Sequence, residues 1–446
     1  KSPKGKLAWW ASPHAPGRKA AAVALSFVLV AGVGSLAGCS SDLGGGESAV
    51  GAAVDGGGGS DSSGSASDSG EAASFAEVAA AFDASALDLD YSKRDTDASY
   101  DDASAVHIVL GGGSASVEGD GATVDGSTVT ITAEGVYVVS GSLDDGQLAV
   151  EAPEDAKVQI VLAGATIHNE DGPAVYVKQA DKCFITLADG TQNALTDGAE
   201  YVLEDGSDEP YATLFSRADL TLNGTGALTV TSAYRHAVCS KDDLVITGGT
   251  YVVNAVEDAL RGRDCVKIAD GDFTLIAGGD GIKSNKDTKA TKGFVSIDGG
   301  TFVIEAGDDG IQAQTYLRIA GGDISIAAVD DALHSNLEGL LAGGTLDIEA
   351  GDDAFHAETK LVIDDGAVNV KACYEGYEAE KLYINGGDTH IVASDDAINA
   401  AAADLGDDDA DAAADASAEA PGYEGGTLPD SMEAPEGAPD GMTPPD

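Results

Sequence analysis

The chain has few aromatic residues and few basic ones, and both shortages limit what it can be. Aromatic side chains make up only 5% of the 446 residues, whereas glycine reaches 59 residues, a composition far from that of a typical helical or α/β enzyme. Only 24 lysines and arginines stand against 77 aspartates and glutamates, so the formal net charge is -53. A body this acidic argues strongly against nucleic acid and anionic membrane surfaces as partners. The charge fits a solvated extracellular surface, divalent cations or both.

Cysteine is also scarce, and none of the five cysteines stands in a Cys-x-x-Cys pair, which argues against a zinc site. Four of them are either buried thiols, the interpretation we favour, or disulfide partners in an exported protein. These are Cys183, Cys239, Cys265 and Cys373. The sequence also lacks a Gly-x-Ser-x-Gly elbow, a phosphate-binding loop and a His-Glu-x-x-His helix. No common motif of nucleophilic or metalloprotease chemistry is therefore present.

Residues 1–39 have the pattern of an export signal. A basic start is followed by an apolar run over residues 20–36, and Leu36-Ala37-Gly38-Cys39 resembles the bacterial lipobox, in which the cysteine is lipidated. The run is short for a membrane-spanning helix, and an ordinary secretory signal or a short membrane anchor is the alternative interpretation. We therefore expect a lipoprotein signal peptide. It predicts a protein on the extracellular face of a bacterial cell membrane, held to the membrane only by the lipid on Cys39.

Two further segments have the composition of unstructured chain. Residues 40–92 are rich in Gly, Ser and Asp and predict a flexible tether, in which the capping box Ser74-Phe-Ala-Glu77 indicates a short helix. Residues 401–446 are rich in Ala, Asp, Pro and Gly and cannot bury enough surface to fold, which predicts a disordered acidic tail. The folded domain is expected over residues 93–400.

Short apolar or alternating runs predict β-strands in this domain. Such runs begin at Val129, Val136, Val158 and Phe184, and Gly and Asp turns bound them. From about residue 220 the pattern repeats every 22 residues: a strand, a turn such as Gly299-Gly300 that needs positive φ, a second strand and an acidic corner. Three strands and three turns fit in one repeat. The prediction is an all-β fold, a parallel β-helix with about 22 residues per coil.

The acidic corner is the most regular element of the repeat. Its members are Glu257-Asp258, Asp280, Asp308-Asp309, Asp330-Asp331, Asp352-Asp353, Glu375 and Asp395-Asp396. Coils of a β-helix lie about 4.8 Å apart, so these carboxylates form a column in which neighbours repel. Calcium, with six to eight oxygen ligands, would relieve this repulsion by bridging adjacent coils. The alternative is that Asp recurs only because it is a good turn residue.

A second column lies three residues beyond each second acid. It comprises Arg261, Lys283, Gln312, His334, His356, Glu378 and Asn399. One interpretation is an ordinary solvated face, and the other is a strip of hydrogen-bonding groups that meets sugar hydroxyls or carboxylates. His334 and His356 are expected to form a stacked polar pair. Tyr377, with Tyr374 and Tyr383 nearby, either stacks on a sugar ring or caps the apolar core.

Several segments resemble a known family. They are residues 174–197, Leu214-Phe-Ser-Arg-Ala-Asp-Leu-Thr-Leu-Asn-Gly-Thr-Gly226, Val256-Glu-Asp-Ala-Leu-Arg-Gly262 and Gly279-Asp-Gly-Ile-Lys-Ser284. Together they are similar to the calcium-binding, β-helical carbohydrate-binding proteins of the cellulose- and pectin-binding type, over about residues 94–400. The resemblance implies a right-handed parallel β-helix, Ca²⁺ bound among the coils, and affinity for plant polysaccharides, including acidic ones.

Three functional hypotheses follow. The first is a cell-surface lipoprotein whose calcium-stabilised β-helix binds polysaccharide, cellulose-like or pectin-like, without converting it. The expected calcium ligands are Asp258, Asp280, Asp308, Asp309, Asp330, Asp331, Asp352, Asp353, Asp395 and Asp396, and the expected carbohydrate-binding residues are Arg261, Lys283, His334, His356 and Tyr377. The second is a calcium-dependent polysaccharide lyase with Arg261 or Lys283 as the base. The third is a structural or adhesive solenoid that binds no glycan.

Overall fold

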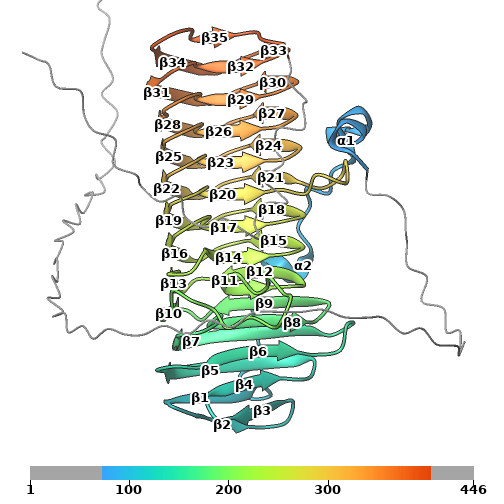
Figure 1. Ribbon diagram of the computed structural model, residues 1–446, viewed down its shortest axis with the longest axis vertical. Helices are drawn as coiled ribbons and strands as arrows, with labels where there is room; N and C mark the ends of the chain where they lie inside the picture. Colours follow the sequence, from blue (N-terminus) through green and yellow to red (C-terminus); the bar gives the residue numbers. More distant parts are fainter. Residues whose placement is uncertain (1–72, 403–446) are drawn as a thin grey trace, which may run out of the picture. The chain divides into compact units, whose positions relative to one another are not determined.

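The 22-residue repeat folds as one coil of a parallel β-solenoid (Figure 1). This computed structural model describes residues 73–402, and it is all-β with about 12 coils of roughly 23 residues each and almost no helix. In the regular coils Leu260 pairs with Ile282 and Ile311 with Leu333, each 22 residues further along the chain. The predicted all-β fold and coil length are confirmed. The export signal, Cys39 and the acidic tail beyond residue 402 lie outside the described residues.

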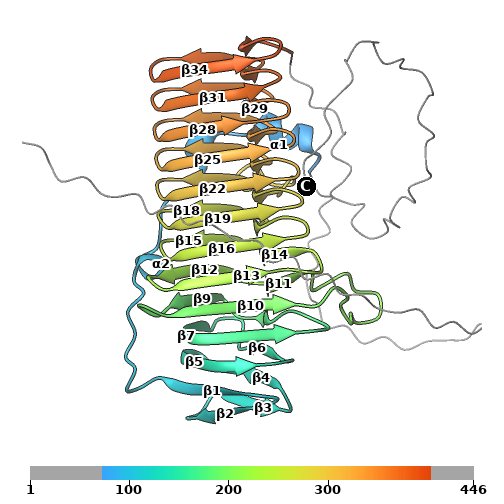
Figure 2. The same ribbon diagram turned by 90° about the vertical axis from the view of Figure 1, so that its left-hand side faces the viewer.

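Each regular coil gives one strand to each of three faces (Figure 1 and Figure 2). The first face is formed by β3 (Ala122–Asp125), β4 (Thr128–Ile131), β6 (Gln147–Glu151), β8 (Val175–Gln179), β11 (Ala212–Ser216), β14 (His236–Ser240), β17 (Leu260–Gly262), β20 (Ile282–Ser284), β23 (Ile311–Ala313), β26 (Leu333–Ser335), β29 (Phe355–Ala357), β32 (Tyr377–Ala379) and β35 (Ile398–Asn399).

The other two faces follow it in each coil. The second face is formed by β9 (Lys182–Leu187), β12 (Asp219–Gly224), β15 (Asp243–Ile246), β18 (Cys265–Ile268), β21 (Phe294–Ile297), β24 (Tyr316–Ile319), β27 (Glu338–Leu341), β30 (Lys360–Ile363) and β33 (Leu382–Ile384). The third face is formed by β10 (Gln192–Asp197), β13 (Ala227–Thr231), β16 (Thr250–Ala255), β19 (Asp272–Ala277), β22 (Thr301–Ala306), β25 (Asp323–Ala328), β28 (Thr345–Glu349), β31 (Ala367–Cys373) and β34 (Asp388–Ala393).

At the N-terminal end the second and third faces merge. β1 (Val106–Gly112), β5 (Gly135–Leu143) and β7 (Lys157–Asn169) are long strands, and β7 pairs with both β9 and β10. The first coil is closed by two antiparallel pairs, β1 with β2 (Ala115–Glu118) and β3 with β4. All other pairings among the described strands are parallel, as a solenoid requires.

The core is a stack of identical positions from successive coils. Tyr251, Phe273 and Phe302 are buried and stacked, with ring centroids 5.1 and 4.6 Å apart. Aliphatic residues continue the same column as Ile324 and Leu346. Inward residues alternate with outward ones along each strand, so one repeat of the sequence provides one layer of core. The four cysteines are free and buried, which confirms the thiol interpretation.

Glycine turns between the second and third faces allow the coils to stack closely. Gly300 has φ of +106°, and a Cβ there would lie 2.8 Å from the carbonyl oxygen of Gly271 in the preceding coil. A longer side chain would therefore be strained in conformation and would clash with its neighbour. The predicted positive φ of these turns is confirmed.

Residues 82–96, here called the N-terminal strap, pack on the second face. The strap follows α1 (Phe75–Ala81), whose predicted capping box is present, and contains the 3-10 turn η1 (Ala84–Ala86) and α2 (Lys93–Thr96). Leu87 joins an apolar cluster with Phe294 and Tyr316, and the hydroxyl of Tyr91 donates to Asp298 at 2.9 Å. Asp95 is only 2% exposed and pairs with Lys182 at 2.8 Å.

These contacts correct part of the tether prediction. Residues 40–92 were expected to be flexible, and of these the structure describes 73–92, whose C-terminal half lies against the solenoid. The composition is polar, but Leu87 and the hydroxyl of Tyr91 contact the second face, and Asp95 just beyond this segment is buried against Lys182. Among residues 73–402, no helix has the length and apolar character needed to cross a membrane.

Candidate functional site: the acidic corner and the third face

The acid pairs stand at the corner before the first face, and the two members of a pair face different environments. The buried members are Asp258, Asp280, Asp309, Asp331 and Asp353, each at most 5% exposed. The exposed members are Asp308, Asp330 and Asp352. The doubling of the acid therefore provides one inner column, held within the solenoid wall, and one outer column in contact with solvent.

The inner column is a ladder of hydrogen bonds between coils. Four of the buried carboxylates, those of Asp258, Asp280, Asp309 and Asp331, accept through Oδ1 the backbone N–H of the equivalent aspartate in the next coil. The donor–acceptor distances are 3.1 Å from Asp280 to Asp258, 2.9 Å from Asp309 to Asp280, 3.0 Å from Asp331 to Asp309 and 2.7 Å from Asp353 to Asp331. His236 begins the ladder, because its Nδ1 accepts from Asp258 at 3.1 Å. We call this the aspartate ladder; it uses Oδ1 and leaves Oδ2 for another partner.

In the two lower coils the partner of Oδ2 is a cationic side chain. The guanidinium of Arg261 lies 3.2 Å from Asp258 Oδ2 and 3.0 Å from His236 Nε2. The ammonium of Lys283 lies 2.7 Å from Asp280 Oδ2. Burial raises the pKa of Asp258, but His236 and Arg261 outweigh it and hold that pKa below its usual value. The chain itself supplies the counter-charge in these coils.

The next coil holds Gln312 at this position, and the two coils after it hold histidine. His334 Nδ1 lies 2.9 Å from Asp331 Oδ2 and 3.5 Å from Asp309 Oδ2. His356 Nδ1 lies 3.5 Å from Asp331 Oδ2 and 3.7 Å from Asp353 Oδ2. The two rings are 5.0 Å apart between centroids and tilted by 37°, so the histidines are neighbours as predicted, but their rings are not stacked in parallel. The pair lies directly on the aspartate ladder.

The carboxyl groups of these coils titrate unusually. Burial, with repulsion from neighbouring carboxylates, raises the pKa of Asp309 and of Asp353 to about 8 and that of Asp280 to about 6. Burial acts in the same direction on Asp331, but hydrogen bonds from His334 and His356 outweigh it and lower its pKa. The ladder therefore contains three carboxyl groups that resist ionisation, Asp280, Asp309 and Asp353, and two whose ionised form is favoured, Asp258 and Asp331.

The carboxylates converge in three places that suit a hard cation. Three groups of acids have ligand atoms within 4.8 Å of one another: Asp280 with Asp308 and Asp309, Asp330 with Asp331 and Asp352, and Asp353 with Glu375 and Glu378. All-oxygen groups of this size fit Ca²⁺, which takes several carboxylate oxygens at 2.3–2.6 Å. Among the described residues, Asp395 and Asp396 join no such group; Asp395 accepts instead from the hydroxyl of Tyr374 at 3.0 Å. Asp258 is already matched by Arg261.

The structure places the predicted carbohydrate-binding residues in two different environments, the outer surface beside the acids and the core. Arg261, Lys283, His334 and His356 form one outward column beside the acids, as expected, but each is engaged with a ladder carboxylate. Tyr377 does not belong to a binding surface. It is 2% exposed and its hydroxyl contacts Thr389 at 3.2 Å, so the prediction that it meets a sugar is wrong and its alternative role in the core is correct. Alternation along β32 places it inward.

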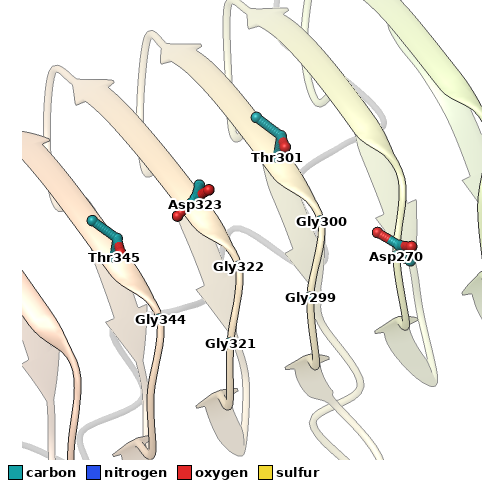
Figure 3. Close-up of a pocket in the computed structure, with 9 residues that line it drawn as sticks. All are labelled: Asp270, Gly299, Gly300, Thr301, Gly321, Gly322, Asp323, Gly344 and Thr345. Carbon is teal, nitrogen blue, oxygen red and sulfur yellow. The ribbon is translucent and has the colours of Figure 1, made fainter. Parts of the chain in front are cut away.

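A second candidate site lies at the edge of the third face. An open groove crosses four successive coils over the glycine turns, and Figure 3 shows its exposed side chains arranged coil after coil. Its lining includes Asp270, Thr301, Asp323 and Thr345 beside the backbone of the glycine pairs. Sequence reasoning interpreted these glycines only as turns. The missed signal was the residue after each turn, which alternates between Thr and Asp from Thr250 to Thr345.

Beside the groove lies the outer surface of the third face, formed by β16, β19, β22, β25 and β28. Adjacent strands pair in register, Thr301 with Asp323 and Asp323 with Thr345, so equivalent side chains form straight columns along the axis. The strap covers part of the second face, and the column of ladder partners occupies the first. Nothing in residues 73–402 covers the third face in this way, and it presents a flat, regular, mainly polar surface.

Fold and surface together define a solenoid protein whose outer columns repeat along the axis. The chain belongs to the family of carbohydrate-binding domain-containing proteins, whose model matches residues 125–339 and 336–416.

Two known proteins are similar to this chain. A carbohydrate-binding domain-containing protein of Acetivibrio thermocellus is 38% identical over 119 residues, which are 26% of this chain and 42% of that protein. The chain therefore matches less than half of that relative's length. The solved structure of a polysaccharide lyase-like protein from C. thermocellum, a gadolinium derivative, is 29% identical with a TM-score of 0.46, covering 64% of this chain and 99% of that one.

Proposed function

We propose that this carbohydrate-binding family member holds an extended polysaccharide along the third face and does not convert it. The observation that carries the proposal is the groove of Figure 3, with its columns of Thr and Asp in register. Coils repeat about every 4.8 Å, close to the length of one sugar unit in an extended chain, so one coil meets roughly one sugar. Hydroxyl and carboxylate side chains match the hydrogen-bonding groups of such a ligand.

Charge favours a neutral, cellulose-like chain on this surface. Asp270 and Asp323 line the groove, and carboxylates accept hydrogen bonds from sugar hydroxyls but repel uronates. An acidic, pectin-like chain would need calcium between its carboxylates and those of the protein. The glycan preference should therefore change with calcium concentration.

Calcium is proposed as a structural ion of the acidic corner. Asp308, Asp330 and Asp352 provide exposed oxygens beside the aspartate ladder, and buried carboxyls with pKa values near 8 indicate a corner that lacks positive charge. One Ca²⁺ between adjacent coils would supply that charge and tie the coils together.

A lyase is the second candidate, and the geometry disfavours the bases that the sequence offered. Burial lowers the pKa of Lys283, but Asp280 and Asp258 outweigh it and raise that pKa, so this ammonium holds its proton more tightly than usual. The guanidinium of Arg261 is bound to Asp258. Neither group is poised to remove a proton from a uronate.

The proposed location is the extracellular face of the membrane, with the lipid on Cys39 as anchor. Labelling of cells with a radioactive fatty acid should mark the wild-type chain and not Cys39→Ala. A lipid label that survives this substitution would contradict the assignment.

The decisive experiment is binding of the whole chain to a panel of neutral and acidic glycans, with calcium and with chelator. Thr301→Ala with Asp323→Ala should reduce retention at least about tenfold by removing two groove contacts. Thr123→Ala, an exposed threonine on β3 of the first face, is the matched control. Binding that these groove substitutions leave unchanged would contradict the site. Release of unsaturated products from pectin would establish the lyase instead.

A further inference from the structure

We propose that Asp331, His334 and His356 form a binding site for a divalent transition-metal ion of the zinc class. Two ring nitrogens and one carboxylate oxygen converge here: His334 Nδ1 lies 2.9 Å and His356 Nδ1 3.5 Å from Asp331 Oδ2. The three ligand atoms all lie within 4.8 Å of one another. This inference goes beyond the glycan and calcium proposals and does not depend on either.

The spacing of these atoms is that of a tetrahedral site. Zinc binds nitrogen and oxygen ligands at about 2.0–2.2 Å, which places neighbouring tetrahedral ligands about 3.3 Å apart. The two measured nitrogen-to-oxygen distances lie on either side of this value. The third separation, between the two histidine nitrogens, is at most 4.8 Å, so an ion would draw these nitrogens into place by side-chain rotation.

The surroundings provide the other parts of a metal site. Asp309 Oδ2 lies 3.5 Å from His334 Nδ1 and Asp353 Oδ2 lies 3.7 Å from His356 Nδ1, so each carboxylate lies beside one of the two histidine ligands. Glu358 Oε1 lies 3.5 Å from His356 Nε2, the ring nitrogen that faces away from the site. A carboxylate in this place orients a metal-binding imidazole and raises its basicity.

A lower coil of the same chain has a cationic side chain at the place where we propose the metal ion. Lys283 occupies the same column two coils below His334, and its ammonium lies 2.7 Å from Asp280 Oδ2. The lower coil thus carries a positive charge against the ladder carboxylate. In the coils of His334 and His356 the column provides nitrogen ligands at this place, and a metal ion would restore the charge.

The ligand set selects this ion over calcium. Imidazole nitrogen suits zinc, copper and nickel, whereas calcium requires oxygen ligands. The absence of Cys-x-x-Cys argued against zinc in the sequence, because that argument considers ligands close together in the chain. Here His334 and His356 are 22 residues apart and meet only because the coils stack.

The test is titration of the metal-stripped whole chain with Zn²⁺ by calorimetry, in a fixed excess of Ca²⁺ because Asp331 also belongs to an all-oxygen group. We expect one zinc-class ion to bind at this site. His356→Gln should weaken binding at least about 100-fold and Glu358→Gln about tenfold. His390→Gln, an exposed histidine of β34 on the third face, is the matched control and should bind as the wild type does.

A second variant separates loss of zinc binding from loss of folding. His334→Lys copies the arrangement at Lys283 and should preserve the melting temperature while abolishing zinc binding. Visible absorption with Co²⁺ as a probe should show the intense bands of tetrahedral nitrogen and oxygen coordination in the wild type only. Zinc binding that survives in folded His334→Lys or His356→Gln, or a wild-type chain that binds no zinc, would overturn the proposal, and neither result would affect the glycan assay.

Discussion

The lower coils of Asp258 and Asp280 and the upper coils from Asp309 to Asp353 share one backbone arrangement but differ in how their buried acids are neutralised. In both regions a buried aspartate accepts the N–H of its equivalent in the next coil. In the lower region Arg261 and Lys283 balance the charge. The upper region has Gln312 and histidines instead, and its carboxyl pKa values rise further, to about 8 for Asp309 and Asp353 against about 6 for Asp280.

The difference shows that two properties of the corner are separable. Hydrogen bonding between coils depends on the aspartate alone and is constant, whereas the partner three residues later is free to vary. A fixed lysine offsets part of the buried negative charge of its coil, and its absence makes the coil more dependent on protons or on bound ions. Four changes in the protein or its conditions, ordered by expected effect on stability, test this division.

The largest effect should come from Lys283→Met, which leaves the buried Asp280 without its cation. Removing one partner of a buried ion pair costs about 3 kcal/mol of unfolding free energy when the lost partner is partly exposed, as Lys283 is. Chemical denaturation measures the loss. Lys371→Met is the control, because its exposed pair with Asp347 should contribute under about 1 kcal/mol. Equal losses in the two variants would show that the lower coil is not held by its internal cation.

Calcium should stabilise the upper coils by nearly as much as Lys283→Met destabilises the lower ones. At 100 times its dissociation constant a bound ion adds about 2.7 kcal/mol to the unfolding free energy. Melting in calcium and in chelator measures the total, and hydrogen exchange locates it. Added protection should fall on residues 308–356 and not on residues 257–262, and an unchanged melting temperature would contradict the calcium proposal.

The metal-free protein should become more stable as the pH falls from about 8.5 to about 5.5, on the order of 2 kcal/mol. The folded pKa of Asp309 and Asp353, about 8, lies above the unfolded value of 3.8, so the folded state binds more protons in this range. That stability is complete below the unfolded pKa and is lost as the pH rises through about 8.

Two comparisons sharpen the pH prediction. Asp309→Asn with Asp353→Asn should flatten the dependence, which denaturation in chelator at the two pH values measures. Asp258 contributes with the opposite sign, because its folded pKa is lowered and its stabilisation is lost only on strong acidification. A metal-free chain that is less stable at about pH 5.5 would refute the assignment of protons to the upper coils.

The smallest effect should come from Asp330→Asn in the exposed outer column. Burial and the nearby Asp331, Asp308 and Asp352 raise the pKa of Asp330, so removing its charge should stabilise the metal-free chain by under about 1 kcal/mol. The same change should weaken the stabilisation by calcium. Thermal melts of Asp330→Asn and of the control Asp388→Asn, on the third face, measure both effects. If Asp330→Asn destabilised the metal-free chain and Asp388→Asn did not, the proposed repulsion between Asp330 and its neighbouring carboxylates would be contradicted.

Much of the fold could be predicted because the structure of each solenoid coil is encoded within a single sequence repeat. Each repeat contains its own strands and turns, and it contacts only its neighbours, so the 22-residue period led directly to the coil and to the column of acids. Even the strands of less regular coils, such as those at Val129 and Val158, were recognisable from their apolar runs.

The site was predicted less fully, because the sequence period gives the position of a residue in its coil but not the direction in which its side chain points. Asp308 and Asp309 are adjacent in sequence, and the path of the corner decides that one is exposed and the other buried. Tyr377 could equally have been a surface residue until its strand was placed. The strap could not be foreseen either, because its contacts with Lys182 and Phe294 join segments far apart in the chain.

The sequence by itself determined the coil, the recurring acid and the identity of its partner in each coil, because all three lie within one repeat. The tertiary structure decided which oxygen serves the backbone ladder, which residues converge from neighbouring coils and which face stays open. Those properties depend on side chains of different coils brought within a few ångströms of one another, where burial and charge, rather than order along the chain, set their chemistry.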